Sequence, residues 1–251
     1  MLAAGVTGAA SCRVSLSPLQ NHVAVGQENY VIFEADGEGE AGQGDLYAVL
    51  GAGGTVFPLT YTRVAESHPV LSPDGVMVAF LRSRQAGDST DARVVVMNLL
   101  NGAERVVWRA DQGRMPYRLG WHPRDPELFI ATTGGVLRAT VPPAPLAVVP
   151  AEDAALADSA LAVMIGSPPF ARVGQCAGGV ELCVVTPAGD EQVLLAGARD
   201  AFRWGPDSVA YVVGASLNIR PLAGGHDRVL RWTKPPRDPR HPTVFVMSPR
   251  R

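Results

Sequence analysis

The sequence predicts an all-β protein, a single β-propeller of five or six blades of antiparallel strands. Three observations support this fold class. Short β-favouring runs recur along the chain, a proline-centred motif precedes several of them, and glycine-containing turns join them in pairs. Apolar residues make up 47% of the 251 residues and charged residues 18%, which is typical of a globular chain with a sizeable core.

The β-favouring runs are short, and turn residues separate them. They are NYVIFEA (29–35), DLYAVL (45–50), VMVAFL (76–81), RVVVMNL (93–99), ELFIAT (127–132), ELCVVT (181–186), SVAYVV (208–213), LNIRPL (217–222) and TVFVM (243–247). The one moderate helix candidate, AEDAALADSALAVM (151–164), is equally compatible with a linker followed by a strand. The fold is therefore expected to contain almost no helix.

A repeat centred on proline divides the chain into units. The best copy is LSPDGVMVAFL (71–81), and the same plan recurs at 16–25, 120–132 and 202–213, with a weak copy at 166–174. Each unit continues through hairpin strands, as in RVVVMNLLNGAERVV (93–107). One such sheet leaves its faces and edges exposed, so packing the units around an axis is favoured. We expect TVFVM to close the ring by pairing with the first blade.

The unit HPVLSPDGVMVAF (68–80) followed by RVVVMNLLNGAERVV (93–107) resembles the WD-like repeat of TolB-type propellers. The resemblance covers most of the chain from 14 to 232. It implies a propeller; six blades are usual in that family, whereas five repeats are visible here. The expected organisation is an N-terminal segment (1–13), the propeller (14–232) and a Pro/Arg-rich C-terminal arm (233–251) with a ring-closing strand.

The acid of the best repeat, Asp74, is interpreted as a turn residue rather than a catalytic carboxylate. In such a turn proline fixes φ, aspartate accepts backbone N–H groups and glycine adopts a positive φ. Asp207 occupies the same place in another copy. The predicted structural turn residues are Ser72, Pro73, Asp74, Gly75, Pro123, Pro206 and Asp207.

The three cysteines leave alternatives open. Cys176 and Cys183 flank a Gly-Gly turn and are predicted either to form a disulfide across a hairpin or to be two independent buried thiols. Cys12 follows small and apolar residues that resemble the end of a lipoprotein signal, which would make it a lipidation site. The alternative is an ordinary uncleaved N-terminus, since no positive region precedes it.

No catalytic, cofactor-binding or metal-binding residues are predicted. The run DGEGEAGQGD (36–45) contains G-x-G-x-x-G, but it joins two strands and its acids would repel phosphate. The five histidines show no paired ligand spacing, and His68, His122 and His241 precede proline, which indicates turns. No G-x-S-x-G motif is present. We therefore expect a protein that is not an enzyme and that has no cofactor.

The net charge of −2, from 22 basic and 24 acidic residues, disfavours a nucleic-acid binder. We expect a non-enzymatic propeller that binds proteins, as an accessory or scaffold subunit of a bacterial envelope or membrane complex. Its location would be periplasmic or membrane-associated, by peripheral or lipid-anchored attachment. The main rival is a small-ligand-binding or lyase/glycosidase-like propeller with a site in the central channel.

Contacts with a partner are predicted in two regions. The first comprises the segments 34–45, 82–93 and 109–118, where the repeats differ most. The second comprises tryptophans beside repeat prolines and basic residues of the C-terminal arm, which four prolines keep extended. These candidates are Trp121, Trp204, Arg237, Arg240, Arg250 and Arg251.

Overall fold

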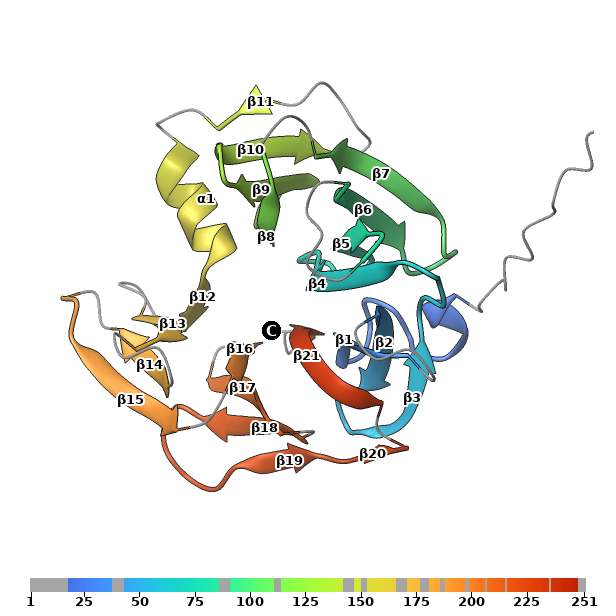
Figure 1. Cartoon of the computed structure of the whole chain (residues 1–251). Coiled ribbons are helices and arrows are strands. Elements are labelled where there is room, and N and C mark those ends of the chain that lie inside the picture. The colour runs from blue at the N-terminus through green and yellow to red at the C-terminus, as the bar shows by residue number, and fades with distance from the viewer. Residues whose placement is uncertain are drawn as a thin grey trace, which may run out of the picture.

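In the computed structural model the chain forms a ring of sheets around a central axis (Figure 1). The structure describes residues 18–37, 43–85, 91–110, 114–141, 147–149, 153–165, 171–176, 181–185, 188–196, 199–205, 207–214, 216–234 and 236–247. These residues form five sheets, so the predicted all-β propeller is confirmed with five blades in the described part of the chain.

Each sheet is a set of neighbouring strands, of which one edge strand lies nearest the axis. The first sheet has the order β20 (Trp232–Thr233), β3 (Gly54–Pro58), β2 (Gly44–Leu50), β1 (Tyr30–Asp36), β21 (Arg237–Phe245). The second contains β4 (Ala65–Leu71), β5 (Met77–Ser83), β6 (Arg93–Asn98) and β7 (Glu104–Arg109). The third contains β8 (Pro116–Trp121), β9 (Glu127–Thr132), β10 (Gly135–Thr140) and β11 (Ala147–Val148).

The last two sheets follow the same plan. The fourth contains β12 (Val163–Ile165), β13 (Ala171–Gln175), β14 (Glu181–Val185) and β15 (Glu191–Ala196). The fifth contains β16 (Arg199–Trp204), β17 (Ser208–Val213), β18 (Ser216–Pro221) and β19 (Arg228–Leu230). The strands nearest the axis are β21, β4, β8, β12 and β16 (Figure 1), and we call them the inner strands.

The core lies between neighbouring sheets, which explains the continuous apolar runs in the sequence. Successive side chains of a strand point to opposite faces. On β5, Val78 and Phe80 pack against the first sheet, whereas Ala79 and Leu81 pack against the third. A strand buried on both faces therefore reads as unbroken hydrophobic sequence.

The first sheet is completed by the C-terminal part of the chain. β21 pairs antiparallel with β1, from Tyr30 opposite Phe245 to Asp36 opposite Arg237. At the outer edge of the same sheet β20 pairs parallel with β3. The closing strand begins at Arg237, six residues before the run TVFVM, because an edge strand tolerates proline at positions that donate no ladder hydrogen bond.

The repeat copy at 16–25 does not form a strand in its described part. Residues Leu19–Asn21 form a short 3-10 helix, η1, and Val23 and Val25 are buried in the core between the first two sheets. The backbone N–H of Gln20 donates to the carbonyl of Leu99 at 3.1 Å. This segment therefore packs on the outside of two blades and supplies no blade of its own.

The segment 151–164, for which the sequence left open a helix or a linker followed by a strand, contains both a helix and a strand. α1 (Ala154–Leu161) is followed directly by the strand β12. Figure 1 shows α1 between the third and fourth sheets, and it contacts β8, β9 and β12. A Cβ atom on Gly120 of β8 would lie 2.3 Å from the carbonyl oxygen of Ala160, so glycine permits this close approach.

Candidate functional site

The two ends of the ring differ in the segments that they carry. In every sheet the inner strand runs from one end to the other, and the next strand returns. The connections between β1 and β2, β3 and β4, β5 and β6, and β7 and β8 therefore lie at the end where the inner strands begin, which we call the loop face. The repeat corner Ser72–Gly75 follows β4 and lies at the opposite end.

Seven polar side chains gather where three of the inner strands begin. We call this group the inner-strand cluster; its members are Glu34 and Asp36 on β1, His68 on β4, Asp200 on β16, and Asp238, Arg240 and His241 on β21. β21 contacts both β4 and β16, so three blades meet there. Ring closure brings these residues together from opposite ends of the sequence.

Glu34 is at the centre of the inner-strand cluster and only 4% exposed. Its Oε1 accepts from Nε of Arg240 at 2.6 Å, and its Oε2 lies 2.8 Å from Nδ1 of His241. Burial raises the pKa of Glu34, but the hydrogen bond and charge of His241 and the charge of Arg240 outweigh burial and lower it. Glu34 is therefore a buried carboxylate that stays ionised.

His68 stacks on His241, with 3.9 Å between the ring centroids and 24° between the ring planes. Its Nδ1 is buried and has no hydrogen-bond partner among the described residues. Burial lowers the pKa of His68 to about 4, and the neighbouring His241 acts in the same direction. The imidazole of His68 is therefore neutral near pH 7, with an unpaired buried nitrogen.

The backbone of the inner-strand cluster is unusual. Five described non-glycine residues have positive φ, and four of them are Asp238, Asp200, His68 (φ 53°) and His241 (φ 46°). His68 and Asp200 lie within register shifts of their strands. Such conformations are costly for side chains with a Cβ, and they concentrate at functional sites.

A second polar network lies in the second sheet. Glu66 of β4 is fully buried, and Arg82 of β5 contacts it at 2.6 Å and Glu104 of β7 at 2.7 Å. Oε2 of Glu66 has no partner among the described residues. Burial raises the pKa of Glu66 to about 7 against the lowering effect of Arg82. This carboxyl group therefore takes up a proton more readily than Glu34 does.

The loop face also carries exposed apolar side chains. Tyr61 precedes β4 and is 61% exposed, and Tyr117 at the start of β8 is 58% exposed. Met115 is 38% exposed beside it. Tyr61 lies in the connection between β3 and β4, and Tyr117 follows the connection between β7 and β8, so both stand on segments of the loop face.

The predicted turn residues form hydrogen-bonded corners where the structure describes them. The Ser72 hydroxyl and the Val76 N–H donate to Oδ1 of Asp74, and Gly75 has a φ of 68°. Pro123 lies in the corner whose His122 Nδ1 accepts from two backbone N–H groups. The carbonyl of Asp207 accepts from the Leu222 N–H at 2.8 Å, and Pro206 lies outside the described residues.

Most of the described tryptophans and arginines that were expected to contact a partner are buried or paired within the chain. Trp121 and Trp204 are 7% and 9% exposed and pack between sheets; Nε1 of Trp121 donates to the carbonyl of Val70. Arg240 is engaged by three carboxylates, those of Glu34, Asp36 and Asp238. Arg237 is exposed, and Arg250 and Arg251 lie outside the described residues. A side chain that is buried or paired within the chain offers little surface to a partner. Of the four candidates that the structure describes, only Arg237 therefore remains a candidate contact.

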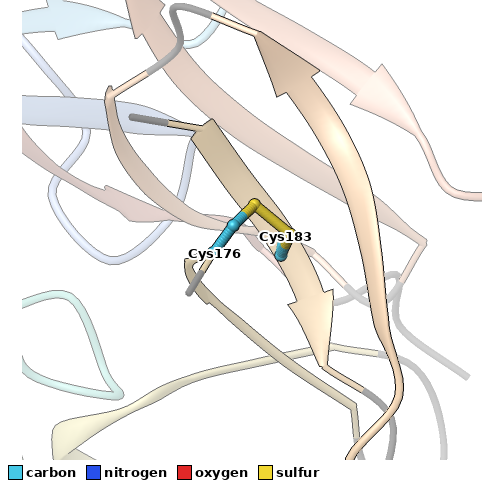
Figure 2. The surroundings of a disulfide bond; sticks show 2 residues. All are labelled: Cys176 and Cys183. Atoms are coloured by element: carbon cyan, nitrogen blue, oxygen red, sulfur yellow. A yellow bond between two sulfur atoms is a disulfide. The ribbon is translucent and has the colours of Figure 1, made fainter. Parts of the chain in front are cut away.

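Cys176 and Cys183 form a disulfide that spans the connection between β13 and β14 (Figure 2). The two Cα atoms are 5.1 Å apart, and seven residues separate the cysteines in sequence. The bond fixes a hairpin of the fourth sheet near the loop face. Cys12 lies outside the described residues.

Sequence reasoning missed the inner-strand cluster. Ligand spacing within one segment does not identify the cluster, because its residues come from β1, β4, β16 and β21. The available signal was the His-Pro pair at 68–69 and again at 241–242. We interpreted both pairs as turns, but both lie within inner strands, and only His122-Pro123 is at a corner.

Comparisons with known proteins identify the fold. No family model matches the sequence, and no curated protein matches it. A crystal structure of TolB from Acinetobacter baumannii has a TM-score of 0.56 at 12% identity, over 90% of this chain and 69% of that chain. A structure of a nidogen/laminin complex also has a TM-score of 0.56, at 11% identity, over 87% of this chain and 99% of that chain. The chain has the fold of a TolB-type β-propeller, assembled in its described part from five sheets.

Proposed function

We propose that this chain is a non-enzymatic propeller that binds a protein partner through its loop face. The observation that carries the proposal is topological: the three segments in which the repeats differ most all open on that face. These segments connect β1 to β2, β5 to β6 and β7 to β8. Their residues 38–42, 86–90 and 111–113 lie outside the described residues, and the strand ends that flank them lie on that face. Connecting segments on a rigid scaffold are where binding residues concentrate.

The exposed aromatic residues support the same face. Tyr61 and Tyr117 are both more than half exposed and stand where neighbouring inner strands begin. Tyrosine is enriched at protein interfaces because one end of its side chain is apolar and the other polar. The nidogen structure with the same fold was solved as a complex with laminin, which shows that one chain of this fold occurs in a protein assembly.

We further propose that the chain works outside the cytosol, as an accessory subunit of an envelope or membrane complex. The disulfide between Cys176 and Cys183 supports this, since such bonds persist in oxidising compartments. The likeness of the fold to TolB is consistent with it. No helix within the described residues is long and apolar enough to cross a membrane. We propose that the chain associates with a membrane through a partner or through lipidation at Cys12.

The test is a cross-linked pull-down from solubilised membranes with the tagged whole chain. The double variant Tyr61→Ser/Tyr117→Ser should lose most of the partner at unchanged melting temperature. The matched control, Leu222→Ser/Val229→Ser, removes exposed apolar groups from the turn after β18 and from β19 of the fifth sheet, and this variant should retain the partner. Recovery of no stoichiometric partner, or equal recovery by both double variants, would contradict the proposal.

A second candidate function is the binding of a small ligand at the axis. The observation in its favour is the convergence of Glu34, His68 and Asp200 from three sheets, which a channel site requires. Thermal-shift screening of small anions, sugars and lactones against wild type and Glu34→Gln distinguishes the two. A stabilising ligand whose effect disappears in Glu34→Gln would favour this candidate, whereas a partner lost only in the tyrosine variant favours the first.

A further inference from the structure

We propose that Glu34, His68 and His241 form a binding site for a divalent transition-metal ion of the Zn²⁺ type. Each residue offers one ligand atom, and these atoms all lie within 4.8 Å of one another. Two imidazole nitrogens and one carboxylate oxygen are a donor set that suits zinc and its neighbours. The site goes beyond the proposed protein binding and does not depend on it.

Binding of an ion requires a local rearrangement of the three side chains. Oε2 of Glu34 and Nδ1 of His241 are already 2.8 Å apart, and the two imidazole rings are stacked. A four-coordinate zinc ion with bonds of about 2.0–2.1 Å holds its ligand atoms about 3.4 Å apart. The pair at 2.8 Å must move apart by about half an ångström and the more distant donor atoms must move inward, and at least one of the stacked rings must rotate so that both imidazole lone pairs reach one ion. Three protein ligands would leave one position for water or a further ligand.

The unpaired nitrogen of His68 points to a missing ligand. Nδ1 of His68 is buried without a hydrogen-bond partner among the described residues. Buried polar atoms are nearly always paired, so an orphan needs a cause such as an ion. A metal ion binds imidazole through a ring nitrogen lone pair, which an unpaired buried nitrogen can offer.

The surrounding charge favours a cation. The inner-strand cluster holds four carboxylates, those of Glu34, Asp36, Asp200 and Asp238, and one guanidinium, that of Arg240. Arg240 occupies Oε1 of Glu34, whereas Oε2 faces His241. The guanidinium therefore fixes the carboxylate from one side and leaves the other oxygen for the ion. Carboxylates that orient ligating side chains in this way are common around metal sites.

The three ligands come from two sheets and would be linked by the ion. Glu34 and His241 belong to β1 and β21 of the first sheet, and His68 belongs to β4 of the second. An ion bound there would tie the closing strand to the neighbouring blade. Because it binds only the folded ring, it should raise the melting temperature with concentration.

The experiment uses the whole chain, freed of metal by chelation and dialysis, in a Cys12→Ser background. That background removes the cysteine outside the disulfide, which could bind zinc adventitiously. Calorimetric titration with ZnCl₂ is expected to show one ion per chain, and ZnCl₂ should raise the melting temperature. His68→Asn, His241→Asn and Glu34→Gln should each weaken binding at least tenfold, since each loses a ligand or its charge.

The matched control is His226→Asn, which changes an exposed histidine on the connection between β18 and β19. It should bind as wild type does. Absence of stoichiometric zinc binding by the wild type would overturn the proposal, as would binding that survives all three ligand substitutions or that His226→Asn reduces equally.

A second measurement covers the case in which a ligand variant does not fold. The wild-type chain is loaded with Cu²⁺ and treated with ascorbate, and oxidised residues are located by peptide mass spectrometry. Oxidation concentrated at His68 and His241 supports the site. Oxidation spread over the other histidines, His22, His122 and His226, contradicts it.

Discussion

The first and second sheets each contain a buried glutamate paired with an arginine, but the two residues occupy opposite strands in the two sheets. In each, an arginine pairs with a buried glutamate on the adjacent strand. In the second sheet the glutamate, Glu66, is on the inner strand and Arg82 follows it 16 residues later. In the first sheet the arginine is on the inner strand, and 206 residues separate Arg240 from Glu34. The same pair is thus a local contact in one blade and a ring-closing contact in the other.

The two glutamates also differ in what occupies their second oxygen. Oε2 of Glu34 lies next to His241, and the pKa of Glu34 is lowered. Oε2 of Glu66 has no partner among the described residues, and the pKa of Glu66 is raised to about 7. The comparison teaches that burial alone raises the pKa of a buried carboxyl group, and that the balance of neighbouring charges and hydrogen bonds decides whether it keeps its charge near neutral pH.

The largest effect should come from removing the closing strand. Deletion of 237–251 leaves β1 without its inner neighbour and removes Val244 and Phe245, which pack against the cores on either side of the first sheet. Their apolar contribution is about 3 kcal/mol. Loss of Arg240, the partner of buried Glu34, adds about as much, so the melting temperature should fall by at least about 10 °C. Thermal unfolding followed by circular dichroism measures this. Deletion of 248–251 is the control, and equal melting of both forms would show that closure adds no stability.

The second-largest effect is the loss of stability when either arginine is removed, and it should differ between Arg240 and Arg82. Arg240→Ala leaves the 4% exposed, ionised Glu34 without its guanidinium and should cost about 3 kcal/mol. Arg82→Ala should cost less, about half as much at pH 6, because Glu66 can take up a proton when its partner is lost. Urea unfolding at pH 6 and pH 8 measures both. Equal costs at both pH values would remove the distinction between the two sheets.

A smaller effect should appear in the pH dependence of stability. The pKa of Glu66 in the folded chain is about 7, above the ordinary value of 4.5, so the folded state holds a proton that the unfolded state has released between these values. Its contribution to stability is present below pH 4.5 and is lost as the pH rises through 7. Glu66→Gln should abolish this fall, roughly 1–2 kcal/mol. Superimposable curves for wild type and variant from pH 4.5 to 8 would refute the assignment.

The smallest effect should come from His68 and have the opposite sign. Its pKa in the folded chain is about 4, below the ordinary 6.5, so the unfolded state binds the extra proton between these values. Stability contributed by neutral His68 is present above pH 6.5 and is lost as the pH falls towards 4. His68→Asn, which suits the positive φ, should reduce this acid sensitivity by about 1 kcal/mol. The measurement is urea unfolding between pH 4 and 7 with a chelator, and unchanged acid sensitivity would contradict it.

The architecture was largely predictable because middle strands of the sheets, such as β5, β9 and β17, are buried on both faces. The runs ELFIAT and SVAYVV coincide with β9 and β17, since continuous apolar sequence bounded by turns leaves little choice. The copy at 16–25 misled because its Ser-Pro and Val-Ala match the repeat while its backbone forms a 3-10 turn. The start of β21 was missed because Pro239 and Pro242 read as an extended arm, although an edge strand tolerates them.

The inner-strand cluster was not predictable in the same way. His68 and His241 are 173 positions apart, and only closure of the ring stacks them. Their positive φ values arise within bulged strands that no local pattern identifies. The disulfide was within reach because both cysteines flank one short connection. Local spacing predicts what one hairpin assembles and misses what three sheets assemble.

The contact between the ends of the first sheet has a consequence for how the gene could be rearranged. The N–H of Met247 donates to Oδ1 of Asn29 at 2.8 Å, so the chain leaves the ring beside the point where β1 begins. The described ring is equivalent to a circular polypeptide opened within its first blade. A circular permutant that starts before β4 and joins 247 to 29 would make β21 and β1 consecutive strands of one hairpin. In that chain every blade would be contiguous in sequence, and completing the first blade would no longer require strands from the two ends of the chain to pair.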